Sequence, residues 1–261
     1  SLSLSFATFV YSLTKTDALV AFLYATTLTS CLNHTFLIIS IISLESKFVK
    51  ICNKSFIDFI NFINEEERLM LLDYEKNLTK NDLWEKRNYA DPQNQWTNRH
   101  LSIIHLLTPE LGFGTEYDIV IAKKLWEIEG RIRKQIKESW NLDKDIWPDC
   151  FNLIRWPHGQ AQPPHSDYEN FSREPHVWNW RDIGCVLYLN DEFEEGEIRF
   201  PQFDREIKIK AGMLAFFPGD IHHAHGVKEV KNGTRYTLNT FYTFSEEHKF
   251  EVDFNRKYGN W

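Results

Sequence analysis

Hydrophobic and polar positions follow different periods in the two halves of this chain. In Phe56–Tyr74 (FIDFINFINEEERLMLLDY), apolar residues recur near helical spacing around an acidic run, which predicts a helix. A second helix is predicted from about Glu116 to Trp140, with basic and acidic residues over its exposed face. The stretch Lys76–Thr97 is polar and turn-rich, and Pro148 closes the helical half.

The second half consists of short β-rich segments separated by Gly, Pro, Asn and Asp. Ile207 and Ile209 alternate with charged residues, the period of two that is typical of a strand with one face in water. The predicted strands are Phe151–Trp156, Ile183–Asn190, Glu197–Phe200, Glu206–Lys210, Met213–Phe217 and Arg235–Phe244. We therefore expect an α+β fold in which helices precede six to eight antiparallel strands that close as a jelly roll.

The N-terminal stretch differs from the rest of the chain in its scarcity of charged residues. Residues 18–44 contain no Asp, Glu, Lys or Arg, which is long enough to span ~30 Å of hydrocarbon. Thr, Ser, Asn and His residues in its middle, and a start without positive charge, argue against a span or a signal peptide. We expect a charge-poor leader at 1–44, with a membrane anchor as the alternative, then a helical part at 45–149 and a β core at 150–261.

Composition narrows the functional classes. The 261 residues carry a formal net charge of −7, which argues against a nucleic-acid partner because phosphate binding needs a basic footprint. The four cysteines (Cys31, Cys52, Cys150 and Cys185) have neither zinc-site nor disulfide-scaffold spacing. We therefore expect a reducing, cytoplasmic location, with a membrane-anchored protein as the alternative.

His165-Ser-Asp167 is the first candidate for chemistry. In an extended segment, residues two apart point to the same side, so the imidazole and the carboxylate converge. In a chain with 10 histidines such a triplet also arises by chance, and alone it is weak evidence.

A third ligand from a distant strand would complete two imidazoles and one carboxylate, the facial triad that holds Fe(II) and leaves positions open. His222, His223 and His225 are the candidates, and His223 would share a face with His225 in an extended segment. The register with Arg235, ten residues after His225, favours His225. On a β segment, Arg235 could clamp a dicarboxylate bidentately.

Together these motifs resemble the prolyl 4-hydroxylase-like branch of the Fe(II)/2-oxoglutarate dioxygenases. The matching strings lie between about 150 and 244, in this order: His165-x-Asp167, Cys185-Val-Leu-Tyr188-Leu-Asn-Asp, Phe216-Phe217, His225-Gly-Val and Gly233-Thr-Arg235-Tyr-Thr-Leu. The resemblance implies a double-stranded β-helix with helices packed on one sheet.

The resemblance also implies roles for particular residues. His165, Asp167 and His225 match the iron ligands, and Arg235 matches the residue that pairs with the C5 carboxylate of 2-oxoglutarate. Tyr188 falls where some relatives place a tyrosine that bonds the same carboxylate. Thr237 and Asn239 share the face of Arg235 and are further candidates for the co-substrate pocket. The implied cofactors are Fe(II), 2-oxoglutarate as co-substrate, and O₂, with ascorbate as an accessory.

Two positions depart from the pattern of the resembling family. Gln162 stands where members often carry a tyrosine, and Glu195-Gly-Glu-Ile198 replaces a Gly-Gly-x-Thr stretch. Substrate choice therefore does not follow from the resemblance.

The segment Tyr168–Trp180, between the first two ligands and the next strand, is either a substrate loop or a solvent loop anchored by its tryptophans. His176 within it is read as a loop histidine. The acidic run from Asp191 to Glu197 is read as a solvated hairpin, with attraction of a basic peptide as the sharper alternative.

The expected function is hydroxylation of a C–H bond of a prolyl residue in a peptide or protein, with succinate and CO₂ as co-products. One alternative is hydroxylation of a free amino acid or small metabolite. Another is a non-catalytic jelly-roll module that binds a metal or ligand. A nucleic-acid demethylase is disfavoured by the net charge of −7.

Overall fold

The computed structural model describes residues 58–81, 83–84 and 99–256, and residues 54–261 form one compact unit. The leader expected at residues 1–44 lies outside the described residues. In the part of the chain that is described, no helix is long and apolar enough to cross a membrane.

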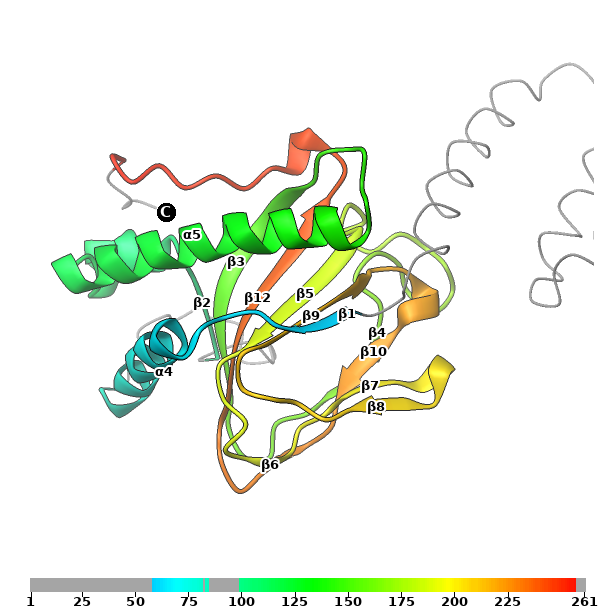
Figure 1. Cartoon of the computed structure of the whole chain (residues 1–261), viewed down its shortest axis with the longest axis horizontal. Coiled ribbons are helices and arrows are strands. Elements are labelled where there is room, and N and C mark those ends of the chain that lie inside the picture. The colour runs from blue at the N-terminus through cyan, green and yellow to red at the C-terminus, as the bar shows by residue number, and fades with distance from the viewer. Residues whose placement is uncertain (1–57, 82, 85–98, 257–261) are drawn as a thin grey trace, which may run out of the picture. The chain divides into compact units, whose positions relative to one another are not determined.

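A six-stranded antiparallel sheet forms the centre of this unit, in the order β1-β9-β5-β12-β3-β2 (Figure 1). Its strands are β1 (Asp58–Asn61), β2 (His100–Ser102), β3 (Trp147–Trp156), β5 (Ile183–Tyr188), β9 (Met213–Pro218) and β12 (Arg235–Thr243). Every residue of β5 and β9 is buried, as their continuous apolar sequences IGCVLY and MLAFFP predict.

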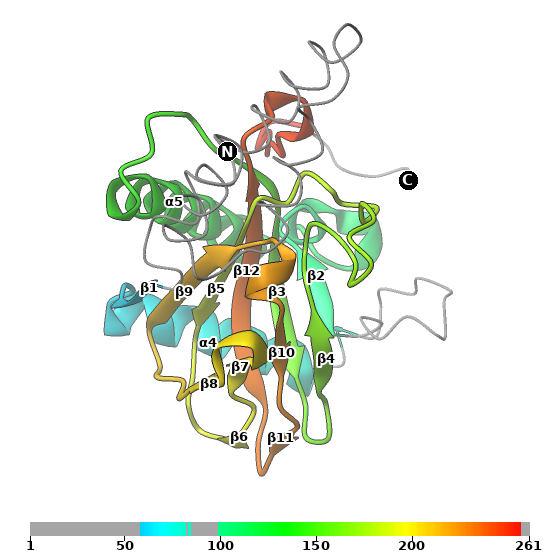
Figure 2. The same cartoon turned by 90° about the vertical axis from the view of Figure 1, so that its right-hand side faces the viewer.

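A second antiparallel sheet, in the order β4-β10-β7-β8, faces the large one and stands in front of it in Figure 2. Its strands are β4 (Gln162–His165), β7 (Ile198–Phe200), β8 (Arg205–Ile207) and β10 (His225–Val227), and β6 (Glu194–Glu195) pairs with β11 (Val230–Lys231). Short 3₁₀ turns are η2 (His105–Leu107), η3 (Pro109–Leu111), η4 (Pro201–Phe203), η5 (Ile221–His223) and η6 (Glu246–His248). The two facing sheets give the jelly-roll arrangement that the sequence predicts.

Two helices cover the other face of the large sheet (Figures 1 and 2). They are α4 (Glu65–Lys80), capped by Asn64, and α5 (Glu116–Ser139), whose capping box joins Thr115 and Asp118. Their apolar faces share one core with β3, β5, β9 and β12. Because each fully buried Leu or Ile contributes about 1.5–3 kcal/mol, this layer fixes the sheet on which the site is built.

The structure confirms the predicted helix at 116–140 and corrects the one at 56–74. Asp58–Asn61 form β1, paired with β9, and α4 begins only at Glu65 and continues to Lys80. The apolar residues before Asn64 suit a strand as well as a helix. Pairing with the edge of β9 favours the strand over the helix. Pro148 lies within β3, next to a bulge opposite Tyr242, where a missing N–H is tolerated.

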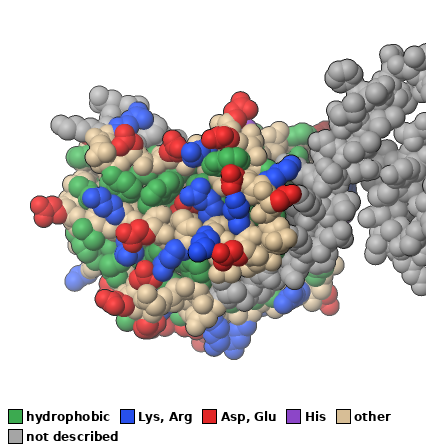
Figure 3. All heavy atoms as spheres, turned by 45° about the horizontal axis from the view of Figure 1, so that its top comes forward, with side chains coloured by type: hydrophobic (Ala, Val, Ile, Leu, Met, Phe, Trp, Pro, Cys, Tyr) green, Lys and Arg blue, Asp and Glu red, His purple; other side chains and the backbone are tan. Residues whose placement is uncertain are grey.

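The exposed face of α5 carries charges of both signs (Figure 3). Its basic side chains form ion pairs with carboxylates: Lys124 with Glu127, Arg131 with Glu67, Lys134 with Glu138 and Lys137 with Asp145. This mixed, paired surface agrees with the scattered charges expected for this helix.

The inner face of α5 carries Glu129, which is 1% exposed. Burial raises the pKa of this carboxyl to about 7 from its ordinary 4.5, against the opposing effect of Arg133, whose Nε lies 3.4 Å from Glu129 Oε1. Between pH 4.5 and pH 7, the folded chain keeps a proton that the unfolded chain has lost. Stability from this group is therefore complete below pH 4.5 and falls as the pH rises to about 7.

Replacing Glu129→Gln should flatten this pH dependence, because an amide does not titrate. A shift of this size corresponds to about 3 kcal/mol at neutral pH, which the variant should recover in part. Urea unfolding of the metal-free protein between about pH 5 and pH 8 measures the effect. Glu138→Gln on the exposed face of the same helix is the control, and an equal pH slope in both variants would contradict the assignment.

Candidate active site

Three side chains that could hold a metal ion meet between the two sheets. His165 ends β4 and His225 begins β10, and the two residues are paired across these strands. Their ring centroids are 4.6 Å apart, and His165 Nε2 lies 3.7 Å from Asp167 Oδ1. One ligand atom from each residue lies within 4.8 Å of the others. The structure thus brings together the triad that the sequence indicates.

Two glycines allow this convergence. A Cβ atom at Gly184 would lie 2.8 Å from Asp167 Oδ2, so a side chain on β5 would occupy the carboxylate's place. A Cβ atom at Gly226 would lie 2.7 Å from Gln162 O, so only glycine lets β10 run this close to β4.

Both imidazoles are oriented by backbone carbonyls. His165 Nδ1 lies 3.2 Å from Pro163 O, and His225 Nδ1 lies 3.2 Å from His223 O. A carbonyl accepts only from a protonated nitrogen, so Nε2 of each ring is left as the lone-pair donor toward the centre. Gln162 Nε2 lies 3.3 Å from His165 Nε2 and would give up this contact to a metal ion bound there.

Asp167 places a buried carboxyl group at the centre of the site. It is 6% exposed, and its Oδ2 has no hydrogen-bond partner among the described residues. Burial raises the pKa of this carboxyl to about 6, although His165 and Arg181 favour the charged form. Burial and the nearby His165 also lower the pKa of His225 well below its ordinary value.

A cation would therefore balance the buried Asp167 carboxylate and bind the two imidazoles, of which His225 favours the neutral form. The donor set of two nitrogens and one oxygen fits Fe(II) with open coordination positions, and it lacks the thiolates typical of structural zinc sites.

A cavity of about 570 Å³ opens over the three ligands. From the large sheet it is lined by residues of β2, β3, β5, β9 and β12, and from the small sheet by β4 and β10. Its outer wall is the segment after the first two ligands: Glu169, Asn170, Phe171, His176, Trp178 and Arg181. The segment Tyr168–Trp180, for which the sequence left two interpretations, therefore forms part of the cavity.

This segment folds back on itself as a small hairpin. Glu169 pairs with Pro175, Asn170 N donates to Glu174 O at 2.9 Å, and His176 N donates to Tyr168 O at 3.1 Å. Phe171 is 64% exposed, so the hairpin presents apolar surface at the cavity mouth.

The base of the hairpin is held by Arg181, which the sequence analysis did not single out. Arg181 Nε donates to Asp149 Oδ2 at 2.6 Å, and the guanidinium lies 4.3 Å from the Trp178 ring centroid and 4.0 Å from that of Phe241. Trp180 Nε1 donates to the same Asp149 oxygen at 3.2 Å. No short-range pattern links Asp149 to Arg181, which lie on β3 and after the loop, so only the fold reveals the pair.

Arg235 and Tyr188 form a buried polar pair behind the cavity. Arg235 is 2% exposed, and its guanidinium lies 5.0 Å from the ring centroids of both Tyr188 and Trp156. Arg235 Nε and Nη1 and the Tyr188 hydroxyl lack hydrogen-bond partners among the described residues. Burial lowers the pKa of Arg235 and raises that of Tyr188. Unmatched donors of this kind are what a buried carboxylate ligand would satisfy.

Arg99 adds a second guanidinium to this region, which the sequence analysis missed. It lies 4.5 Å from the Trp156 ring centroid and bonds Gln160 through its Nη1. Burial and the neighbouring Arg235 lower the pKa of Arg99 to about 10. Two cations on one indole ring favour an anion beside them.

The two remaining candidates on β12, Asn239 and Thr237, differ in whether they reach the cavity. Asn239 lines the cavity opposite its strand partner Asn152, and its Oδ1 is buried without a partner in the described part of the chain. Thr237 is fully buried, and its hydroxyl donates to Ile154 O at 3.4 Å. Neither Arg235 nor Tyr188 is among the cavity-lining residues. Arg235 precedes Asn239 on β12 and Tyr188 follows Val186 on the antiparallel β5, so both lie toward the same end of the sheet.

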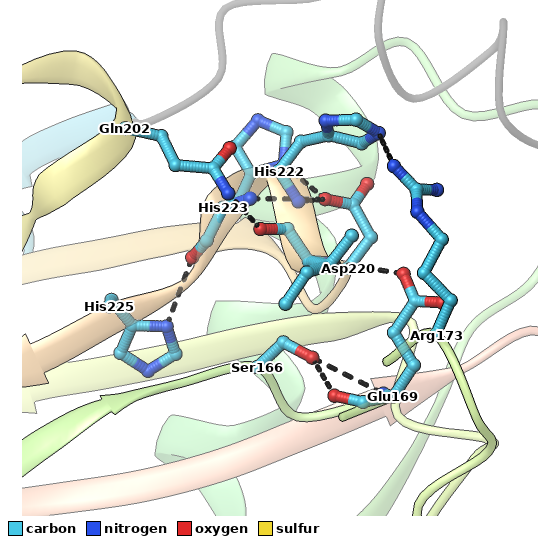
Figure 4. A network of polar contacts seen from close by, with 9 residues as sticks. Ser166, Glu169, Arg173, Gln202, Asp220, His222, His223 and His225 are labelled. Carbon is cyan, nitrogen blue, oxygen red and sulfur yellow. Dashed lines mark hydrogen bonds and ion pairs between the residues drawn. The ribbon is translucent and has the colours of Figure 1, made fainter. Parts of the chain in front are cut away.

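The rings of His222 and His223 point away from the ring of His225 (Figure 4). His223 Nδ1 lies 2.6 Å from Asp220 Oδ1, and His222 Nε2 lies 3.4 Å from Arg173 Nη2. Of the three candidates for the third ligand, the geometry therefore brings His225 to His165 and Asp167.

Residues 151–243 match a sequence model of the family described as 2OG-Fe(II) oxygenase superfamily. Prolyl 3-hydroxylase 3 of Homo sapiens is 32% identical over 82 residues, which are 30% of this chain and 11% of that protein. Prolyl 3-hydroxylase 1 of Mus musculus is 30% identical over 160 residues, 53% of this chain and 22% of that protein. The chain thus spans only a small part of the length of these relatives.

Two solved structures share the fold. A viral collagen prolyl hydroxylase from Paramecium Bursaria Chlorella virus-1 has a TM-score of 0.51 at 16% identity, covering 74% of this chain and 97% of that one. A prolyl hydroxylase from Trichoplax adhaerens, solved with a hypoxia inducible factor peptide, has a TM-score of 0.54 at 18% identity, covering 85% and 96%. The double-stranded β-helix with N-terminal helices is confirmed.

Single replacements of His165, Asp167 or His225 by Ala should weaken divalent metal binding strongly, because each leaves two of three ligands. Titration with Mn(II) or Co(II) under nitrogen measures the affinity. His223→Ala serves as the comparison: if it abolished metal binding while His225→Ala retained it, the ligand assignment would be wrong.

Proposed function

We propose that this chain, whose residues 151–243 match the 2OG-Fe(II) oxygenase superfamily, hydroxylates a prolyl residue of a peptide or protein. The reaction converts substrate, 2-oxoglutarate and O₂ into hydroxylated substrate, succinate and CO₂. The observation that carries the proposal is the His165–Asp167–His225 triad beneath a cavity, with the buried guanidinium of Arg235 behind the cavity, where its Nε and Nη1 have no hydrogen-bond partner among the described residues.

The three ligands would hold Fe(II) through His165 Nε2, His225 Nε2 and the Asp167 carboxylate. Bound iron supplies the activation of O₂ that removes hydrogen from an unactivated carbon. The protein would position the reactants and limit the access of water: the cavity wall formed by β5 and β9 is fully buried, and Phe217 and Phe241 line the cavity.

Arg235 and Tyr188 would bind the distal carboxylate of 2-oxoglutarate. The guanidinium and the hydroxyl are buried side by side, and both have free hydrogen-bonding capacity within the described residues. Arg99 reinforces the positive potential from across the Trp156 ring. Asn239, between this pair and the triad along β12, would contact the middle of the same molecule.

The charges of the cavity support a peptidyl substrate over a free amino acid. A free amino acid would bring its own α-carboxylate close to the reacting carbon, and this negative charge would need a cationic partner in the cavity. Among the described residues that line the cavity, Arg181 is the one cationic Arg or Lys side chain that could pair with such a carboxylate. Its charge is already offset by the ion pair with Asp149. Inside a peptide the same carbons are flanked by neutral amides, which need no such partner.

The shape of the mouth points the same way. Phe171, Val177 and Trp178 are exposed large apolar residues on the hairpin, with exposures of 64%, 72% and 42%. Aromatic faces suit the apolar ring of proline, and an open rim accommodates an extended chain. The relatives named as prolyl hydroxylases add support, although their matches are short or show the fold alone.

Arg235→Ala should raise the 2-oxoglutarate requirement more than Tyr188→Phe does. Losing a buried, charge-assisted contact costs about 2–5 kcal/mol, or roughly 30- to several-thousand-fold in affinity. Titration of 2-oxoglutarate into the Mn(II)-loaded protein without O₂ measures the loss directly. A larger effect from Tyr188→Phe would refute the assignment of the carboxylate to Arg235.

Substrate class is tested by competition. Succinate release and addition of one oxygen atom are followed by mass spectrometry with proline-containing peptides, free L-proline and other free amino acids. We expect coupled hydroxylation of a peptide, and the product fixes the ring position. Coupling with a free amino acid alone would contradict the peptidyl proposal, and no succinate with any substrate would favour a non-catalytic module.

The hairpin offers a matched pair of variants for the same assay. Phe171→Ala should raise the KM for a peptide, whereas Leu69→Ala, which removes an exposed apolar side chain on α4, should leave it unchanged.

A further inference from the structure

We propose that Asp220 is a positioning residue of the metal centre: its carboxylate closes the turn Gly219–His223, which holds both Asp167 and His225 in place. The inference rests on the proposed function in that it concerns the same three ligands. It adds a residue that makes no contact with the metal position itself.

One carboxylate oxygen organises the turn (Figure 4). Asp220 Oδ1 accepts from the backbone N–H of His222 at 3.0 Å and of His223 at 3.1 Å. The same oxygen lies 2.6 Å from His223 Nδ1. The His223 side chain is fully buried and that of Asp220 is 16% exposed, so this bond is largely shielded from water.

The two ends of the turn contact two different ligands. At its start, Gly219 O accepts from the backbone N–H of Asp167 and of Tyr168, each at 3.0 Å. At its end, His223 O lies 3.2 Å from His225 Nδ1 and sets the direction of that ring. The turn thus spans the gap between the strand end that carries Asp167 and the strand that carries His225.

Other contacts also brace the turn: at its end, His223 N donates to the backbone oxygen of Asp220 at 3.1 Å, and the Phe203 ring centroid lies 5.5 Å from that of His223. Gln202 Nε2 donates to Ile221 O at 2.8 Å, and Ile221 N donates to Glu169 Oε1 at 3.2 Å. The peptide of His223, whose carbonyl orients His225, is anchored by the Asp220 side chain through both its backbone N–H and its ring.

Removing the Asp220 carboxylate would take away its contacts with the backbone N–H and the ring of His223 and so loosen this residue, whose carbonyl would then hold His225 Nδ1 less firmly in one direction. Nε2 of His225 would then sample several positions relative to Asp167. Loss of such ligand-orienting contacts in metal sites lowers metal affinity by roughly 10- to 100-fold.

The test compares three variants of the whole chain by Co(II) and Mn(II) affinity and by the visible spectrum of bound Co(II). Asp220→Ala should lose about 10- to 100-fold in affinity and change the Co(II) spectrum. Asp220→Asn keeps an acceptor oxygen and loses only the charge, so a smaller loss of about two- to tenfold is expected.

Asn64→Ala is the matched control, since Asn64 also caps a helical segment through its side chain but lies on α4. It should lower thermal stability while leaving metal affinity within about twofold of the wild type.

Affinities of both Asp220 variants equal to that of Asn64→Ala would overturn the inference, and Asp220→Asn suffices if Asp220→Ala does not fold. A wild-type chain that binds neither metal would instead overturn the proposed function.

Discussion

The burial of one carboxylate between two sheets is the constraint on which the rest of this structure depends. Asp167 is enclosed by β5, the Gly219–His223 turn and two imidazoles, and it keeps one oxygen unsatisfied within the described residues. An uncompensated charge in such a place costs several kcal/mol. The carboxylate stays in place because the surrounding strands, which pack against α4 and α5, hold its backbone. A bound cation would neutralise the buried charge, so relief of this unfavourable energy would contribute to metal affinity.

The strand part of the site could be predicted from the sequence because β-structure has a strict period. Tyr188 and Val186 share a face in the structure, and Leu187 and Leu189 pack into the opposite core, as parity required. Arg235 falls on the same inner face, ten residues after His225. Residue types with distinct chemistry at regular spacing therefore made His165, Asp167 and His225 candidates, and the resemblance to the dioxygenases implied their roles and that of Arg235.

Other features depend on contacts that no local pattern carries. β4 contains two prolines and β10 only three residues, so neither reads as a strand until each pairs with the other. The Asp149–Arg181 bond joins residues 32 apart, and Arg99 approaches Trp156 from an entirely different segment. The first part of the predicted helix at 56–74 became a strand because an open sheet edge was available, which the sequence of the segment does not encode.

β1 has a consequence for how this protein could be divided into fragments. The region that matches the family begins at residue 151, well after β1 in the sequence. Nevertheless, β1 pairs with the edge of β9, and α4 and α5 cover apolar side chains of the same sheet. A recombinant fragment limited to residues 151–243 would present a bare strand edge and an uncovered apolar face, both of which promote self-association. The minimal autonomous fragment is thus defined by what shields the sheet, and it must begin upstream of Asp58.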